Sequence, residues 1–463
     1  MIERPNSAAA MDIASHLHPY TNARKHETEG PMVITEGKGI FVYDDQGKEY
    51  IEGLAGLWYA ALGFSEERLA QAAAEQLRRL PCYHSFAHKS PLPTIELAAK
   101  LLEIAPVPMS KAFFANSGSE ANDTMIKMVW YYNNALGRPE KKKIISRIKA
   151  YHGVTVATAS LTGLPYNHRD FDLPIANILH TSCPHHYRFG QPGESEEDFA
   201  TRCADELEQL ILDEGPETIA AFIGEPVMGA GGVIVPPRTY WDKIQAVLRK
   251  YDVLLVADEV ICGFGRTGNL FGCQTFNIKP DIITMAKALS SGYLPISAVL
   301  ISDPVYQTIA DNSAKIGTFG HGYTYSGHPV PAAVALETLK IYEERDIVGH
   351  VRQVGPRLQE GLGRYADHPM VGEVRGVGLI AGVELVADRA SKATFDPPGR
   401  VGGYFAERAQ AHGLIIRNLM DVIALCPPLI ITEDQIDSLV ERFARALDDT
   451  ASWVEHEGLA SVA

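Results

Sequence analysis

The sequence predicts an α/β protein with a large, doubly wound, mostly parallel sheet domain and a smaller α+β domain built from both chain ends. Its 463 residues are 46% hydrophobic and 21% charged, a globular composition long enough for more than one domain. Between about residues 110 and 325, short β-branched runs alternate with helical patterns, which is typical of a parallel sheet covered by helices on both faces. Neither chain end has enough apolar residues to fold alone, so we expect the two ends to join.

The expected elements follow in chain order. Residues 30–60 read as a small meander, because turns at 37–39 and 44–47 flank apolar runs. After about residue 330, a helix-rich stretch leads to two short strands, two prolines and a final amphipathic helix. We therefore divide the chain into an N-terminal segment (1–60), a large domain (61–330) and a C-terminal small domain (331–463). The expected strands are 40–43, 49–51, 111–115, 143–147, 219–224, 253–257, 282–286, 414–417 and 422–425.

Charge and hydropathy exclude two classes of partner. The net charge of -15 is spread along the chain, and the basic run 141–143 precedes an apolar stretch, so we expect no nucleic acid. The first twelve residues lack the apolar core of a signal peptide. No run approaches the roughly 18 apolar residues that a membrane span needs. We therefore expect no membrane contact and a cytoplasmic location.

The cysteines indicate neither disulfides nor a metal site. Six cysteines without a CxxC pair are typical of reduced, buried thiols. Cys183, His185 and His186 could ligate a metal, but no matching second half stands elsewhere in the chain. We expect no metal.

Lys287 and Asp258 are the most informative residues. Lys287 closes the apolar run 281–286, and Asp258 ends the earlier run 252–257. Ligands of open α/β folds bind at the carboxyl ends of strands, so an acid and a lysine would stand together there. Pyridoxal phosphate needs this pair, since the lysine holds its aldehyde as a Schiff base and the carboxylate keeps the ring nitrogen protonated. Taken alone, Asp258 is better explained as a helix cap and Lys287 as a solvated loop residue; together they favour pyridoxal 5'-phosphate as the cofactor.

A phosphate site is expected where the run 111–115 gives way to a helical pattern. Ser117 and Glu120 have the spacing of a capping box. Free backbone N–H groups and the helix dipole at such a start suit a phosphate dianion. We therefore expect Ser117, Gly118 and Ser119 to bind the cofactor phosphate, with an ordinary helix cap as the alternative.

Two further motifs lie near predicted strands. Tyr151 follows the run 143–147, so its ring could stack on the pyridine ring, although a core tyrosine is an equal alternative. Residues 263–268 match GxGxxG, a dinucleotide-binding pattern. No clear helix follows Gly268, however, and Asp281 precedes a strand instead of following one. We therefore do not expect a nicotinamide cofactor.

In this combination of motifs the chain resembles the class III, fold-type I pyridoxal-phosphate aminotransferases, and within them the ω-amino-acid or amine:pyruvate transaminases. The resemblance extends over nearly the whole chain. The motifs that carry it are 18–21, 53–58, 116–120, 151–153, 224–226, 258–260, 263–268, 286–287, 324–329, 375–378, 417 and 427–428.

The resemblance implies a homodimer, or a dimer of dimers, with active sites at the subunit interface. Lys287 would carry the Schiff base and move the substrate proton, while Asp258 would pair with the pyridinium. Tyr151 and Val260 would enclose the ring, and Thr324 would reach the phosphate from the other subunit. The implied cofactor-binding residues are Ser117, Gly118, Ser119, Tyr151, His152, Glu225, Asp258, Val260, Lys287 and Thr324.

The resemblance also implies which residues bind the substrate. Tyr20, Trp58 and Phe86 match positions that shape the pocket, with core packing as the alternative. Arg417 would bind the carboxylate of the acceptor. A neutral amine brings no carboxylate, so the arginine must then point away or be neutralised.

Two positions depart from the wider family. Relatives that act on ornithine or 4-aminobutyrate carry a glutamate that pairs with the substrate-binding arginine. Ala230 stands there in this chain and leaves Arg417 without that partner, as in amine:pyruvate enzymes. In many relatives a Gly-Asp turn follows the substrate-binding arginine. This chain has Met420-Asp421 there, and this difference affects where the side chain of Arg417 is placed.

We therefore expect a transaminase that moves an amino group from an amine or ω-amino acid donor to a keto acid, with pyruvate as the expected acceptor. The two half-reactions would give ping-pong kinetics. One alternative is an aminomutase or decarboxylase on the same fold. The other is a non-enzymatic or nucleotide-binding dimer.

Overall fold

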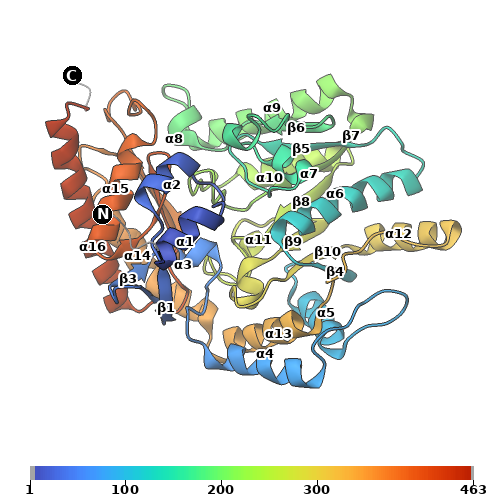
Figure 1. Ribbon diagram of the computed structural model, residues 1–463. Helices are drawn as coiled ribbons and strands as arrows, with labels where there is room; N and C mark the ends of the chain where they lie inside the picture. The colour runs from blue at the N-terminus through green and yellow to red at the C-terminus, as the bar shows by residue number, and fades with distance from the viewer. Residues whose placement is uncertain (1–5, 460–463) are drawn as a thin grey trace.

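The structure is a computed structural model that describes residues 6–459, and its centre is a seven-stranded sheet (Figure 1). The strand order is β4-β10-β9-β8-β7-β5-β6, in which β10 runs antiparallel to both neighbours and the remaining pairs are parallel. The predicted α/β fold with a mostly parallel sheet is confirmed. The strands are β4 (Lys111–Ala115), β5 (Lys143–Arg147), β6 (Ile178–Thr181), β7 (Ile219–Gly224), β8 (Leu254–Asp258), β9 (Ile282–Met285) and β10 (Ser297–Ile301). Of these, β6 and β10 were not predicted.

Helices cover both faces of this sheet. In β7, Ala221 and Ile223 pack into one apolar cluster and Phe222 into another, because side chains alternate along a strand. The first cluster is covered by α6 (Gly118–Ala135), α7 (Val156–Leu161) and α12 (Asp303–Ile316). The second is covered by α5 (Leu92–Ile104), α9 (Glu196–Glu214), α10 (Tyr240–Lys250) and α13 (Pro329–Glu344), with α4 (Glu67–Arg79) packed on α13.

The two chain ends meet in the first of two smaller sheets. In the first, Leu414 of β13 pairs with Ile51 of β3, and Figure 1 shows the blue N-terminal segment against the red C-terminal helices. The strand expected at 414–417 is divided between both sheets. The first sheet is β1 (Ile34–Lys38), β2 (Phe41–Asp44), β3 (Glu49–Glu52) and β13 (Leu414–Ile415); the second, in the order β11-β12-β15-β14, is β11 (Val371–Val377), β12 (Ile380–Leu385), β15 (Val422–Leu425) and β14 (Arg417–Leu419).

The remaining helices are short or belong to the chain ends. They are α1 (Ala8–Ser15), α2 (Ala23–Glu29), α3 (Ala55–Trp58), α8 (His186–Phe189), α11 (Gly272–Thr275), α14 (Ile347–Gly363), α15 (Arg400–Ala411), α16 (Glu433–His456) and the 3₁₀ turns η1 (Pro165–Asn167), η2 (Pro216–Thr218) and η3 (Lys287–Ser290). Among residues 6–459, no helix combines the length and the hydropathy that crossing a bilayer requires. The expectation for the first twelve residues falls partly on 1–5, outside the described residues. The proposed domain boundaries stay predictions.

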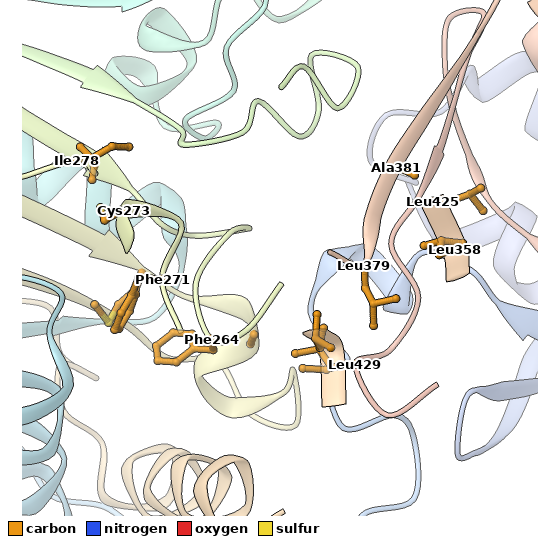
Figure 2. Packing of buried hydrophobic residues seen from close by; sticks show 14 of the residues in the cluster. Phe264, Phe271, Cys273, Ile278, Leu358, Leu379, Ala381, Leu425 and Leu429 are labelled. Carbon is orange, nitrogen blue, oxygen red and sulfur yellow. The ribbon is translucent and has the colours of Figure 1, made fainter. Parts of the chain in front are cut away.

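The GxGxxG stretch 263–268 is a turn that joins the large domain to the C-terminal lobe. Arg266 is buried, and its Nη1 donates to the carbonyl oxygens of Leu379 (3.0 Å) and Pro427 (2.5 Å). In Figure 2, Phe264 lies between the large-domain core and Leu429 of the C-terminal lobe. The motif therefore connects two lobes and opens no dinucleotide-binding helix.

The hairpin β14–β15 carries Arg417 and turns at a strained residue. Met420 has a φ of 56°, in the left-handed region that glycine adopts readily. Asp421 fixes the turn from outside, because its carboxylate accepts from the backbone N–H groups of Gly399 and Gly402, each at 2.8 Å.

We expect Met420→Gly to raise the melting temperature, because a left-handed residue with a Cβ costs roughly 1 kcal/mol. Met420→Ala is the matched control, since it removes the same side chain and keeps the Cβ. Equal melting temperatures of the two variants would show that this turn stores no backbone strain.

Candidate active site

Asp258 and Lys287 stand at neighbouring strand ends of the central sheet. Asp258 is the last residue of β8 and pairs in register with Thr284 of β9, and Lys287 follows two residues after β9 with a φ of 48°. Both side chains line one pocket, as the positions of the strands predict. The lining residues are Gly118, Ser119, Asn122, Tyr151, His152, Gly153, Glu225, Asp258, Val260, Ile261 and Lys287.

The buried carboxylate of Asp258 is held by three N–H donors. Its Oδ2 accepts from Asn122 Nδ2 (2.8 Å) and from His152 Nδ1 (2.7 Å), and its Oδ1 accepts from Val260 N (3.1 Å). Asn122 Nδ2 also donates to the carbonyl oxygen of His152 at 2.8 Å. These donors keep a charge in place that burial alone would make costly. Asn122 was not predicted, because in the sequence it is only an amide side chain on the apolar face of a helix.

The N-terminus of α6 forms the opposite end of the pocket. Ser117 is the helix cap, and its Oγ accepts from Glu120 N at 3.1 Å. The predicted capping box is only half formed, because Glu120 Oε2 accepts from Asn116 N (2.7 Å) instead of from Ser117 N. The first amides of a helix have no acceptor within it, so those of Gly118 and Ser119 are suited to an anion. A Cβ at Gly118 would lie 3.0 Å from Val260, so glycine permits this close approach.

Glu225 connects Tyr151 to the glycine-rich loop at residues 228–232. Its Oε1 accepts from Tyr151 N (3.1 Å), and its Oε2 accepts from Gly229 N (3.0 Å), next to the half-buried Ala230. Burial raises the pKa of Glu225. Burial, together with the neighbouring Tyr20, also raises the pKa of Tyr151, so its hydroxyl stays protonated. Glu225 therefore positions two loops around the pocket.

Lys287 is the basic group of the pocket. Burial lowers the pKa of its amine, an effect that the negative charges of Asp258 and Glu225 oppose. A lowered pKa increases the fraction of neutral amine, which is the form that acts as nucleophile and base.

Arg417 and Tyr20 lie on the substrate side. Arg417 is half-buried, and within residues 6–459 its side chain has no ion pair or hydrogen bond. It lies close enough for its charge to lower the pKa of Tyr166, although burial raises that pKa overall. Tyr20 Oη accepts from Asn167 Nδ2 at 2.6 Å, and its ring meets Tyr166 edge-on at 6.3 Å. Asn167 and Tyr166 were not predicted from the sequence.

Trp58 is buried in an apolar cluster that includes Ile261, a lining residue of the pocket. Its turn is built by Glu52, whose carboxylate oxygens accept from Leu54 N and Gly56 N, each at 2.9 Å. Burial raises the pKa of Glu52 to about 7. Trp58 is therefore packed in the core, which was the alternative to a role in the pocket. It also lies behind the wall of the pocket.

Phe86 and Thr324 lie away from Lys287. Phe86 lines a separate cavity of about 720 Å³ together with residues 318–322. A Cβ at Gly322 would lie 2.9 Å from the Phe86 ring, so the loop of Thr324 and Phe86 are neighbours. Thr324 itself is exposed. Within one chain, neither residue lines the pocket of Asp258 and Lys287.

The pattern of the family "Aminotransferase class-III" matches residues 21–447. The chain belongs to the class-III aminotransferases. It is 54% identical over 457 residues to gamma aminobutyrate transaminase 3, chloroplastic, of Solanum lycopersicum, covering 97% of this chain and 88% of that protein.

Solved structures agree with this assignment. The omega transaminase from Pseudomonas jessenii in complex with PMP is 64% identical with a TM-score of 0.96, covering 97% of this chain and 99% of that one. A thermostable omega transaminase variant, W58M/F86L/R417L, engineered for asymmetric synthesis of enantiopure bulky amines, has the same identity and TM-score and covers 97% of this chain and 100% of that one.

The protein is therefore an aminotransferase that uses pyridoxal 5'-phosphate and transfers an amino group between an amine donor and a keto acid. The pocket fits this cofactor. It offers a buried carboxylate to a ring nitrogen, free helix amides to a phosphate and an amine to an aldehyde. Within the described chain, Asn122 Oδ1 and His152 Nε2 are buried without partners, so the pocket has polar capacity left for a ligand.

We expect Asn122→Ala to lower kcat by about 10- to 100-fold, since a hydrogen bond to a charged group contributes roughly 1.5–3 kcal/mol. Asn133→Ala is the matched control. Asn133 is equally buried on α6, but it bonds Val129 O and does not line the pocket. Steady-state turnover and melting curves of both variants test this. A loss of kcat that simply follows the loss of stability in both variants would contradict a positioning role for Asn122.

Proposed function

We propose that this aminotransferase is an amine or ω-amino acid:pyruvate transaminase whose working unit is a homodimer. The observation that carries the proposal is Arg417, a half-buried guanidinium beside the Lys287 pocket without an ion-pair partner among residues 6–459. Ala230 stands in the neighbouring loop where a glutamate would neutralise it. An unpaired guanidinium is suited to bidentate binding of a keto-acid carboxylate.

The pocket residues divide the chemistry among them. Bound pyridoxal phosphate would act as an electron sink and would carry the amino group between the two half-reactions. The amine of Lys287 takes the proton from the substrate carbon and returns it. Asp258 holds a proton at the ring nitrogen, while Ser117, Gly118 and Ser119 bind the phosphate. Tyr151 and Val260, which both line the pocket, would enclose the ring of the cofactor.

The substrate-binding side of the pocket must accept two kinds of molecule, a keto acid and an amine. Arg417 serves the carboxylate of the acceptor, and aromatic walls serve the side chain of an amine donor. The engineered relative carries W58M, F86L and R417L, and this chain has the same residue types at those numbers, Trp58, Phe86 and Arg417. The name of the 54% identical relative supports 4-aminobutyrate among the ω-amino acid donors to test.

Two residues that lie away from the pocket of their own chain support the proposed dimer. Phe86 and Thr324 share a region away from Lys287, and this region also exposes apolar surface at Ile95 and Tyr325. A second copy of the chain would cover that surface and receive Phe86 and Thr324 at its own site. The cytoplasmic location stays a prediction, since a relative is named as chloroplastic.

We expect Arg417→Ala to lower kcat/KM for pyruvate and for ω-amino acids by about 30- to 1,000-fold, because a desolvated charged contact is worth roughly 2 to 4 kcal/mol. The half-reaction with a neutral amine such as 1-phenylethylamine should stay close to wild type. Single-turnover measurement of each half-reaction separates the two.

Asn418→Ala, in the same strand, is the control and should leave both half-reactions unchanged. If Arg417 only supports the hairpin, Arg417→Ala loses stability and both half-reactions fall together. That result would defeat the proposed role in binding the carboxylate.

We expect Lys287→Ala and Thr324→Ala homodimers to be impaired, and their mixed dimer to recover one intact site. In the mixed dimer, the subunit with a working lysine receives a normal threonine from its partner, while the other site carries both defects. Activity of purified mixed dimers, made with two distinguishable tags, is the measurement. A mixed dimer no more active than the Thr324→Ala homodimer would place Thr324 in its own subunit's site.

A further inference from the structure

A group of four metal-binding side chains lies outside the active site, in the N-terminal segment. His18 Nε2 and His26 Nε2 lie 2.8 Å and 2.9 Å from Asp12 Oδ2, and His16 Nδ1 lies 3.1 Å from Asp12 Oδ1. The ring centroids of His16 and His18 are 4.3 Å apart, and those of His18 and His26 are 4.2 Å apart. A surface cavity of about 270 Å³ opens beside the three histidines.

The local fold brings these residues together. Asp12 and His16 are four residues apart at the end of α1, so they share one helix face. His18 follows in the connecting segment, and His26 comes from α2, which returns against α1. Neither helix buries any of its residues within this chain. The cluster is therefore not a by-product of core packing.

Hydrogen bonding alone accounts poorly for this arrangement. A single carboxylate balances the charge of only one protonated histidine. A second protonated histidine held against the same carboxylate is repelled by the first. Three neutral imidazoles and one carboxylate together form a set of ligands that suits one divalent transition-metal ion.

We propose that Asp12, His16, His18 and His26 bind one divalent transition-metal ion, with zinc as the representative ion. The ligand atoms of Asp12, His16 and His18 all lie within 4.8 Å of one another. A tetrahedral zinc site separates its ligand atoms by about 3.3 Å, so Asp12, His16 and His18 need only small side-chain rotations to reach that spacing. His26, whose Nε2 lies 2.9 Å from Asp12 Oδ2, would supply the fourth ligand. Magnesium and calcium prefer oxygen ligands and do not fit.

A second group of possible ligands lacks this capacity. His185 Nε2 lies 2.8 Å from Glu373 Oε2, and Glu384 is near. However, Arg375 Nη1 lies 2.6 Å from a carboxylate oxygen of each glutamate, and its guanidinium also binds Gly232 O. Arg188 also pairs with Glu384, so two fixed cations already balance the two carboxylates and no metal is proposed there.

The proposed ion would act on the structure rather than on the reaction. It would join α1 to α2 across the segment that contains Tyr20, two residues after His18. Tyr20 contacts Asn167 and Tyr166 on the substrate side of the pocket. A bound ion would therefore limit the motion of this segment and of Tyr20.

The test uses tag-free holoenzyme, because a histidine tag binds the same metals. After chelator treatment and dialysis, zinc chloride is titrated by calorimetry, and cobalt(II) binding is followed by visible absorption. We expect one zinc per chain and the intense visible bands of tetrahedral cobalt. His18→Gln and His26→Gln should each weaken zinc binding by at least about tenfold. His456→Gln, which changes an exposed histidine beside Glu457, should bind zinc as the wild type does.

Zinc bound by the cofactor or by scattered surface groups would remain in every variant, so equal affinities of the wild type and His18→Gln would overturn the proposal. Labelling of wild-type histidines with diethyl pyrocarbonate, read by mass spectrometry, tests the site without a substitution. Zinc should protect His16, His18 and His26 and leave His456 reactive. Unchanged labelling of the three histidines under saturating zinc would likewise refute the site.

Discussion

The buried carboxylate of Asp258 is the constraint around which the active site is built. A charge in the interior of an α/β domain is tolerated only when donors satisfy it, and Asp258 obtains three from separate parts of the chain. Asn122 comes from the helix that presents free amides to a phosphate, and His152 comes from the loop that carries Tyr151. Holding this charge therefore also fixes the distance between the phosphate end and the ring end of the pocket.

The second requirement is that two lobes keep a fixed relation, because Lys287 belongs to the large sheet and Arg417 to a small one. Arg266 connects them by donating to Leu379 O and Pro427 O. Arg375 does so at another point by binding Gly232 O in the loop that follows Glu225. Both guanidinium groups bond to backbone carbonyl oxygens. They therefore hold the backbones of the two lobes in place, and not only flexible side chains.

Local patterns and the common direction of parallel strands predicted five of the seven strands of the central sheet, the neighbouring strand ends of Asp258 and Lys287 and the helix start at Ser117. They did not predict Asn122, because an asparagine in a helix gives no sign of a partner 136 residues away. The half-formed capping box at Glu120 was also beyond the pattern, since spacing does not say which N–H a carboxylate reaches. The Asp12 group was missed because His18 and His26 reach Asp12 only through the turn between α1 and α2.

The electrostatics of the pocket explain why its acid and base can stand side by side. Asp258 receives its donors within the protein, whereas the amine of Lys287 has no hydrogen-bond partner among residues 6–459, so burial favours its neutral form. Glu225 is buried as well, but backbone N–H groups occupy both of its oxygens, and its proximity partly offsets the effect of burial on Lys287. Arg417 has the opposite influence on Lys287 and lowers its pKa further. A carboxylate bound to Arg417 would screen that charge, so the occupancy of the substrate side is coupled to the basicity of the lysine.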